Sequence, residues 1–238
     1  MYFWLIPLII GFIAFIVFII FRVKERRKEA VIIKGFVSLM FIVTALVCWL
    51  LSPVNTHGTF GIFILLGLFF GLLGDVFLDL KYIVFKKEFL FTVLGFIAFA
   101  EGHIFYIIGL FVYFYNFNAH ILYLIIPLII AATLAAVTVL MEKFTPIRYN
   151  KMKPYVIIYG FILFLVTSLY ISSAIQAEWN IVTLNIMAVS FILFAASDLI
   201  LNNTYFATGF DGPLFIITNH ALYYIAQFLI AVSLFFLI

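Results

Sequence analysis

Two aspartates lie inside strongly apolar stretches of the chain, where an ionisable side chain is costly and is therefore a candidate for function. Asp75 stands in the segment GDVFL and Asp198 in the segment SDLIL. If both carboxyl groups face one cavity of low dielectric constant, they cannot both ionise easily, so one would keep its proton while the other carries a charge. Such a pair can act as a general acid and a general base.

The polar residues around these aspartates recur in the two halves of the chain. Lys34 and Lys153 are 119 residues apart, and the two aspartates are 123 apart. His103 and His220, which each begin a His-x-x-Tyr motif, are 117 apart. Three matches in the same order predict a four-helix unit duplicated once, with both halves in the same orientation because four is even. A pseudo-two-fold axis along the membrane normal would then bring the two aspartates together.

The elements that must position these residues are apolar runs long enough to cross a bilayer. The chain is 68% hydrophobic and only 10% charged, whereas a soluble domain carries about 25% charged residues. A spanning helix needs about 20 apolar residues, and such runs fall at 2–21, 33–52, 59–80, 89–113, 121–140, 154–174, 180–201 and 214–237. The sequence therefore predicts an all-α, polytopic membrane protein with eight transmembrane helices. They form a single transmembrane domain over 1–238, with repeat halves at about 1–114 and 115–238.

The distribution of positive charge predicts how these helices cross the membrane. Twelve of the 13 lysine and arginine residues lie between the first and second, the third and fourth, or the fifth and sixth runs, and the other, Lys34, is the second residue of the second run. Cytosolic loops carry the excess of Lys and Arg. We therefore expect these loops in the cytosol and both termini on the non-cytosolic side, in the plasma membrane if the protein is bacterial.

Several other classes of site find no support in the sequence. Cys48 is the only cysteine, so a disulfide framework and a thiolate metal site are both excluded. The intramembrane His and Asp residues lack a recognisable ligand spacing, and no glycine-rich phosphate loop is present. We expect no metal, no cofactor and no nucleic acid partner, and no pattern in the sequence sets the oligomeric state.

The chain resembles the YhhN family, which includes the lysoplasmalogenases. The matching stretches are GLFFGLLGDVFL at 67–78, HIFY at 103–106, LFAASDLIL at 193–201 and YIAQ at 224–227. Lys34, Pro154 and Tyr159 also stand at positions that look like family positions. One departure is Glu101, which replaces a more apolar residue and is expected to change the polarity of the cavity.

The resemblance implies that the protein hydrolyses the vinyl ether bond of lysoplasmalogen, a lysophospholipid, to a fatty aldehyde and a glycerophospho-base. Asp75 and Asp198 would be the catalytic pair, and membrane lipid would surround the protein. Lys34 or Lys153 would hold the phosphate of the substrate near the cytosolic surface. The remaining residues expected to bind substrate are His103, Tyr106, Tyr159, His220, Tyr224 and Gln227.

A second class of function uses the same carboxylates without hydrolysis. A proton-coupled transporter or a lipid-binding membrane protein would also place ionisable groups inside its helices. A transporter needs a path to the far side, yet the outer parts of the third and seventh runs, 59–69 and 181–193, offer few polar side chains. The small number of polar side chains in these parts favours a closed pocket that faces the cytosol.

Overall fold

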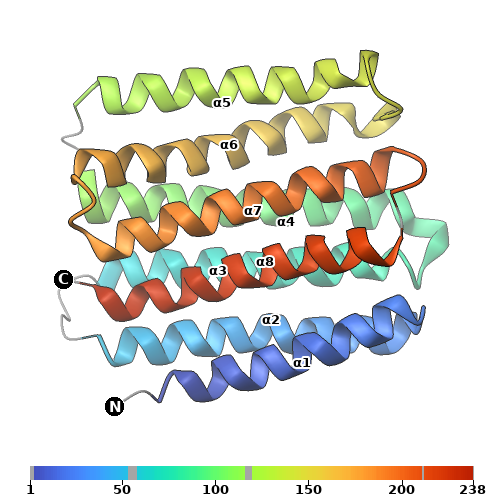
Figure 1. Cartoon of the computed structure of the whole chain (residues 1–238), viewed down its shortest axis with the longest axis horizontal. Helices are drawn as coiled ribbons and strands as arrows, with labels where there is room; N and C mark the ends of the chain where they lie inside the picture. The colour runs from blue at the N-terminus through green and yellow to red at the C-terminus, as the bar shows by residue number, and fades with distance from the viewer. Residues whose placement is uncertain (1–2, 53–57, 116–119, 211, 238) are drawn as a thin grey trace.

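The chain folds into a bundle of helices (Figure 1), seen in a computed structural model that describes residues 3–52, 58–115, 120–210 and 212–237. Within these ranges eight helices are long and apolar enough to cross a membrane, which confirms the prediction of an all-α protein with eight spans. They are α1 (Leu5–Val23), α2 (Arg27–Leu50), α3 (Gly58–Leu80), α4 (Glu88–Leu110), α5 (Leu122–Leu140), α6 (Lys153–Gln176), α7 (Val182–Phe206) and α8 (Pro213–Ser233).

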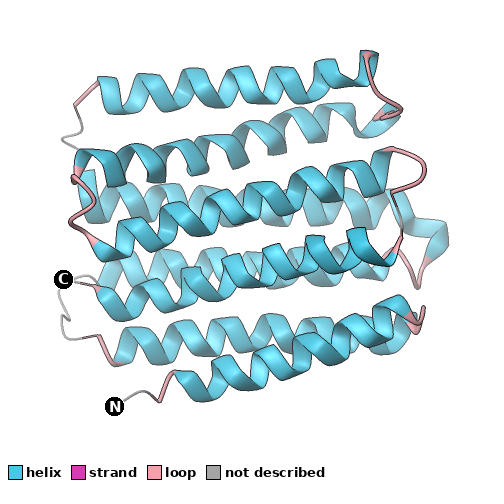
Figure 2. Ribbon diagram, in the orientation of Figure 1, coloured by secondary structure: helices cyan, strands magenta, loops and turns pink. Residues whose placement is uncertain are grey.

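Short helical turns extend or join these helices, and no strand occurs among the described residues (Figure 2). Four are 3-10 turns and one, η3, is a π-helical turn that continues α4. Their bounds are η2 (Phe85–Lys87), η3 (Phe111–Tyr115), η4 (Met141–Lys143), η5 (Asn150–Met152) and η6 (Leu234–Phe236).

The helices run side by side along one direction, with α3, α4, α7 and α8 in the middle of the bundle (Figure 1). α1 and α2 lie along one edge, and α5 and α6 along the opposite edge. α1 packs mainly on α2, and α5 packs mainly on α6. These two outermost helices are the least buried of the eight, so most of their apolar side chains are left for lipid to solvate.

Two helices extend well beyond their predicted ends. α2 begins at Arg27, six residues before the predicted run, and α7 continues to Phe206, five residues after it. In the last turns of α7, Asn203 and Thr204 each donate a hydrogen bond to the carbonyl four residues earlier. Hydropathy marks the apolar part of a helix, whereas polar turns that satisfy their own hydrogen bonds continue it into the interface.

The loops that carry the cations lie at one end of the bundle, while α1 begins and α8 ends at the other (Figure 1). This arrangement agrees with the even number of crossings. The predicted start of the first span at residue 2 lies outside the described residues, as do most of the cation-free loops at 52–58 and 115–120. Which end faces the cytosol stays a prediction.

The packing of the inner helices has the symmetry that a duplication would produce. α2 packs against α3 and α8, and α6 packs against the equivalent helices α7 and α4. His103 and His220 also make the same contact, since the Nδ1 atom of each lies at hydrogen-bond distance from the carbonyl oxygen four residues earlier (2.6 and 2.8 Å). The 4+4 repeat stays a prediction, and these equivalences agree with it.

Glycines let α4 approach closely to α3, the helix that carries the predicted catalytic Asp75. A Cβ atom at Gly67 would lie 2.3 Å from the ring of Tyr106, and one at Gly102 would lie 2.9 Å from the carbonyl oxygen of Gly67. Small residues permit this close packing between apolar helices, where lipid supplies no hydrophobic driving force. The contact fixes the position of α3, on which Asp75 lies.

Candidate active site

A cavity of about 400 Å³ lies at the end of the bundle that carries the basic loops. It extends from exposed side chains, among them Arg27 and Glu88, to the buried Asp75 and Tyr223. Asp198 lines the same cavity. Every helix except α5 contributes to its wall. The structure therefore brings the two aspartates of the predicted catalytic pair to one cavity that reaches the surface.

This cavity occupies only the half of the bundle that is nearer the basic loops. Its lining residues fall within 22–34, 75–99, 197–205 and 216–223, together with Tyr159. Each of these segments belongs to the half of its helix nearer the basic loops. Among the residues described, none from the opposite half of the bundle lines it, so the predicted apolar outer parts of α3 and α7 are indeed closed to this cavity.

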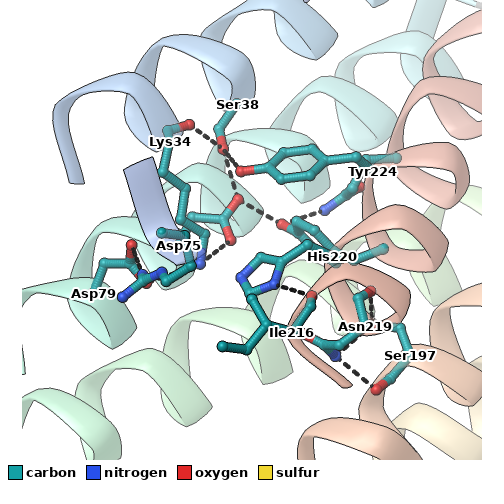
Figure 3. A network of polar contacts seen from close by, with 12 residues as sticks. Lys34, Ser38, Asp75, Asp79, Ser197, Ile216, Asn219, His220 and Tyr224 are labelled. Carbon is teal, nitrogen blue, oxygen red and sulfur yellow. Dashed lines mark hydrogen bonds and ion pairs between the residues drawn. The ribbon is translucent and has the colours of Figure 1, made fainter. Parts of the chain in front are cut away.

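Asp75 on α3 is surrounded by hydrogen-bond donors (Figure 3). Its Oδ1 atom lies 3.1 Å from the ammonium nitrogen of Lys34 on α2. Its Oδ2 atom accepts hydrogen bonds from the hydroxyl groups of Ser38 (2.6 Å) and Tyr223 (2.7 Å). A carboxylate has about four acceptor sites and no donor. Three donors, one of them charged, therefore stabilise the anionic form of Asp75 and leave room for one further donor, such as a water molecule.

Lys34 belongs to a chain of alternating charges. Its ammonium group lies between Asp75 and Asp79, 3.2 Å from the Oδ1 atom of the latter. Asp79 in turn accepts a hydrogen bond from Arg22 on α1. Two cations and two anions alternate, so the buried network is neutral as a whole, which is the condition under which charges can be buried at acceptable cost.

Asp198 on α7 lies in a different environment. Its Oδ2 atom accepts a hydrogen bond from the phenol of Tyr159 on α6. None of the ion pairs found among the described residues includes Asp198. A carboxyl group in an apolar wall without a cation is far more stable in its neutral, protonated form. The two aspartates therefore differ in the way that a general acid and its partner base must differ.

The two aspartates differ in environment because Lys34 and Lys153 have different partners. Lys34 and Lys153 are equivalent in the predicted repeat, but only Lys34 turns towards the aspartate of its own half. Lys153 pairs instead with Glu142 (2.7 Å) and its side chain is 47% exposed. Lys153 lines neither this cavity nor the smaller one described below, so the structure does not bring it to the other predicted substrate-binding residues.

Five of the predicted site residues line the cavity, and four others lie behind its wall. The five are Asp75, Asp198, Lys34, Tyr159 and His220. Tyr224 and Gln227 support the first aspartate from α8: the Tyr224 hydroxyl lies 3.5 Å from that of Ser38, and the Gln227 amide donates to Tyr223 (3.0 Å). His103 and Tyr106 pack deeper in the bundle, where the ring of His103 lies 5.8 Å from that of Tyr159.

One expectation about the cavity is wrong. Glu101 was expected to change its polarity, but this side chain is exposed on the outer face of α4 and lines neither cavity. Residues one position apart on a helix point about 100° away from each other. The buried His103 faces the interior, and Glu101, two positions earlier and so about 200° around the helix axis, faces the opposite side.

Several contributors to the site carry a signal that sequence reasoning passed over. Lys34 and Ser38 are four residues apart, as are Asp75 and Asp79. Polar residues at this spacing share one face of a helix, and in the structure the two faces meet. Arg22 gave no such signal, because its place at the end of the first run is typical of a simple interfacial anchor.

The described residues contain no group of three or more His, Cys, Asp or Glu side chains that could hold a metal ion. Asn219 and Ser197 fix the contact between α7 and α8 beside the cavity, because the Asn219 amide donates to the carbonyl and the hydroxyl of Ser197 (2.8 and 3.0 Å; Figure 3). The chemistry that these side chains can perform is proton transfer between two carboxyl groups and a ligand in the cavity.

Comparison with known proteins identifies one family. The family model described as the YhhN family matches residues 30–234. No curated protein and no solved structure matches the chain. The match covers both aspartates, and the lining residues Arg22, Glu25 and Arg27 lie before its start.

Proposed function

The chain belongs to the YhhN family, and from this premise we propose that it is a membrane hydrolase that cleaves the vinyl ether bond of lysoplasmalogen. The products are a fatty aldehyde and a glycerophospho-base. The observation that carries the proposal is the unequal environment of two aspartates in one cavity. Asp75 has a cation and two hydroxyl donors, whereas Asp198 has a single phenol donor.

The first step is protonation of carbon. A vinyl ether is hydrolysed when its β-carbon accepts a proton, which leaves an oxocarbenium ion at the carbon bonded to oxygen. The neutral carboxyl group of Asp198 supplies this proton and becomes a carboxylate. The Asp75 carboxylate stabilises the positive charge that develops on the substrate.

The second step returns both carboxyl groups to their starting states. Water attacks the oxocarbenium carbon and gives its proton to Asp75, which produces a hemiacetal. When the hemiacetal collapses, the glycerol oxygen leaves with the proton from Asp75, and the hemiacetal hydroxyl returns its proton to Asp198. The sum is one alkenyl ether and one water converted to one aldehyde and one alcohol, without a cofactor.

A second cavity supports a position for the hydrocarbon chain of the substrate next to this chemistry. A smaller, mostly apolar cavity of about 50 Å³ lies between α4, α5, α6 and α7. It shares Tyr159, Asp198 and Tyr205 with the larger cavity and continues along Val156, Gly160 and Phe164 of α6. The vinyl ether joins the polar glycerol to the apolar chain, so its carbons would lie at the junction, beside Asp198.

Gly160→Leu is expected to shorten the chain that the enzyme accepts. A Cβ atom at Gly160 would meet nothing within 4 Å, so a larger side chain can enter the smaller cavity without displacing a neighbour. We expect kcat/KM to fall about tenfold or more for substrates with long alkenyl chains, since each buried CH₂ group contributes about 0.8 kcal/mol, and to change little for short chains.

The matched control for this variant is Gly212→Leu. A Cβ atom at Gly212 also meets nothing within 4 Å, but Gly212 lines neither cavity. Aldehyde release is measured for a series of chain lengths. An equal loss at every chain length in Gly160→Leu would contradict the placement of the chain.

The proposed function is tested on the purified protein in detergent with lysoplasmalogen as substrate. In D₂O the released aldehyde should carry one deuterium on the carbon next to the carbonyl group, because that carbon takes its proton from a solvent-exchangeable carboxyl. The alkyl ether analogue, which has no double bond, should release nothing. If the wild-type protein releases no aldehyde, or an aldehyde without deuterium, the proposed reaction is wrong.

We also propose that the basic end of the bundle faces the cytosol, in the plasma membrane of a bacterium if the source is bacterial. The cations of the loops at this end and the positive-inside rule support this orientation. Lysoplasmalogen would then enter from the surrounding bilayer and present its head group to the cytosolic side.

A further inference from the structure

Lys81, directly after α3, is a buried cation without an acidic partner at ion-pair distance. The residue is only 7% exposed and lines the larger cavity. No ion pair or hydrogen bond of its ammonium group occurs among the described residues. Its nitrogen lies instead 3.2 Å from the ring centroid of Tyr205 and 5.0 Å from that of Tyr82. A buried charge is costly unless it is paired, so this one indicates a missing anion.

The other cations of the cavity are already compensated or exposed. Lys34 lies between two aspartates, and Arg22 is paired with Asp79. Arg27 is exposed and lies over the ring of Phe85. Lys81 is therefore the buried cation of this wall that can receive a negative ligand.

We propose that Lys81, between the rings of Tyr82 and Tyr205, binds a phosphodiester group at the mouth of the cavity. The identification of that group as the head group of a lysophospholipid rests on the proposed function. Neither Lys34 nor Lys153, which were expected to hold the phosphate, has a free charge directed into this space.

The position of Lys81 suits such a substrate. Lys81 lies six positions after Asp75, which corresponds to a rise of about 9 Å along a helix. In a lysoplasmalogen the vinyl ether and the phosphate occupy the two ends of one glycerol unit. A phosphate at Lys81 would therefore leave the vinyl ether deeper in the cavity, towards the aspartates.

The charge of Lys81 should depend on pH. Burial lowers the pKa of Lys81 to about 7, and the nearby Glu88 and Asp79 oppose this shift only in part. A phosphodiester stays singly negative across this range, so its own charge does not change. Binding should therefore be strongest below pH 7 and weaken as the pH rises through about 7, when the free lysine loses its proton. The titratable or charged groups around Lys81 are Glu88, Asp79, Arg22, Lys34, Tyr82, Tyr205 and His220.

The test measures binding without turnover, by the thermal unfolding of the purified full chain in detergent. Three probes are compared: glycerophosphoethanolamine, lysophosphatidylethanolamine, and a monoacylglycerol with the same chain. We expect both phosphodiesters to stabilise the wild-type protein, and the lysolipid to do so more strongly than the monoacylglycerol. If only the lysolipid stabilises the protein, the ligand is the head group of a membrane lipid rather than a free phosphodiester. If neither phosphodiester stabilises the protein, the proposal is overturned.

Variants then assign the effect to Lys81. Lys81→Met should weaken phosphodiester binding about tenfold or more, the magnitude of a lost charged hydrogen bond. Lys81→Arg should keep the binding but lose its dependence on pH near 7, because arginine stays charged. Lys86→Met is the matched control, since Lys86 is exposed in the same connection, does not line the cavity and should behave as wild type. Unchanged binding in Lys81→Met would overturn the proposal.

Failure of the subsite and failure of the proposed function can be told apart. If phosphodiester binding depends on Lys81 but no aldehyde is released, the hydrolase is wrong and the subsite stands. If aldehyde is released, the KM of Lys81→Met is compared for lysoplasmalogen and for the alkenylglycerol that lacks phosphate. A rise confined to the phosphate-bearing substrate supports the subsite, and equal KM changes for both would refute it.

Discussion

Asp198→Asn is expected to lower kcat for aldehyde release about 1,000-fold, the magnitude typical of a lost general acid. Asparagine has nearly the shape of aspartic acid and can still accept the hydrogen bond of Tyr159, but it cannot give a proton to carbon. The cavity and the substrate-binding surface should be preserved. The measurement is kcat from initial rates of aldehyde release, together with the thermal shift caused by lysophosphatidylethanolamine.

Asp79→Asn provides a matched comparison for this prediction. It makes the same change in an aspartate that lines the same cavity, but the carboxylate of Asp79 is paired with Arg22 and Lys34 and takes no part in the proposed proton transfers. We expect a much smaller loss of kcat for this variant. If a folded Asp198→Asn protein keeps a tenth or more of wild-type kcat, Asp198 is not the acid.

The number of helices and the two candidate aspartates can be predicted from the sequence for one physical reason. A bilayer has no water for polar groups, so spanning segments must be long, apolar and helical. Each rare exception, such as Asp75 or Asp198, then stands out against a uniform background. Hydropathy does not predict where a helix ends, because polar residues such as Asn203 continue the helix through their own hydrogen bonds.

The partners of the polar residues were harder to predict, because they depend on side-chain direction and on long-range contacts. Lys34 and Lys153 are equivalent in the predicted repeat, and their sequence surroundings differ only slightly, in that Ser38 stands four residues after Lys34 and Ile157 four residues after Lys153. The deciding partner of Lys153 is Glu142, from the preceding helical turn η4. Lys81 directly follows an apolar run, a place typical of an interfacial cation, although in the structure it is buried in the wall of the cavity.

The different partners of the two lysines explain how two halves related by the predicted repeat carry two chemically different carboxyl groups. An exact two-fold site would place both aspartates in identical environments, and neither would be fixed as acid or base. In this chain one half supplies its aspartate with a cation and the other half does not. The asymmetry that the proposed mechanism requires therefore depends on Lys34, so the charge network around Lys34 is tested next.

Lys34→Met is expected to destabilise the protein by about 3–5 kcal/mol, the usual cost of removing one member of a buried ion pair. The ammonium group compensates the charges of both Asp75 and Asp79. Without it, Arg22 is the one cation of this network left to compensate two buried carboxylates. The free energy of unfolding is measured in mixed micelles. Lys153→Met is the matched control, because its ion pair is half exposed and should contribute no more than about 1 kcal/mol.

The double variant Lys34→Met, Asp79→Asn separates stability from chemistry. It removes one charge of each sign and leaves Arg22 and Asp75 as one cation and one anion, so most of the lost stability should return. Activity should not return with it, because Asp75 no longer has a cation 3.1 Å away to hold it as the anion that stabilises the oxocarbenium ion. If the double variant recovers its stability and its kcat together, Lys34 serves the fold alone, and the assignment of Asp75 as a cation-held base is wrong.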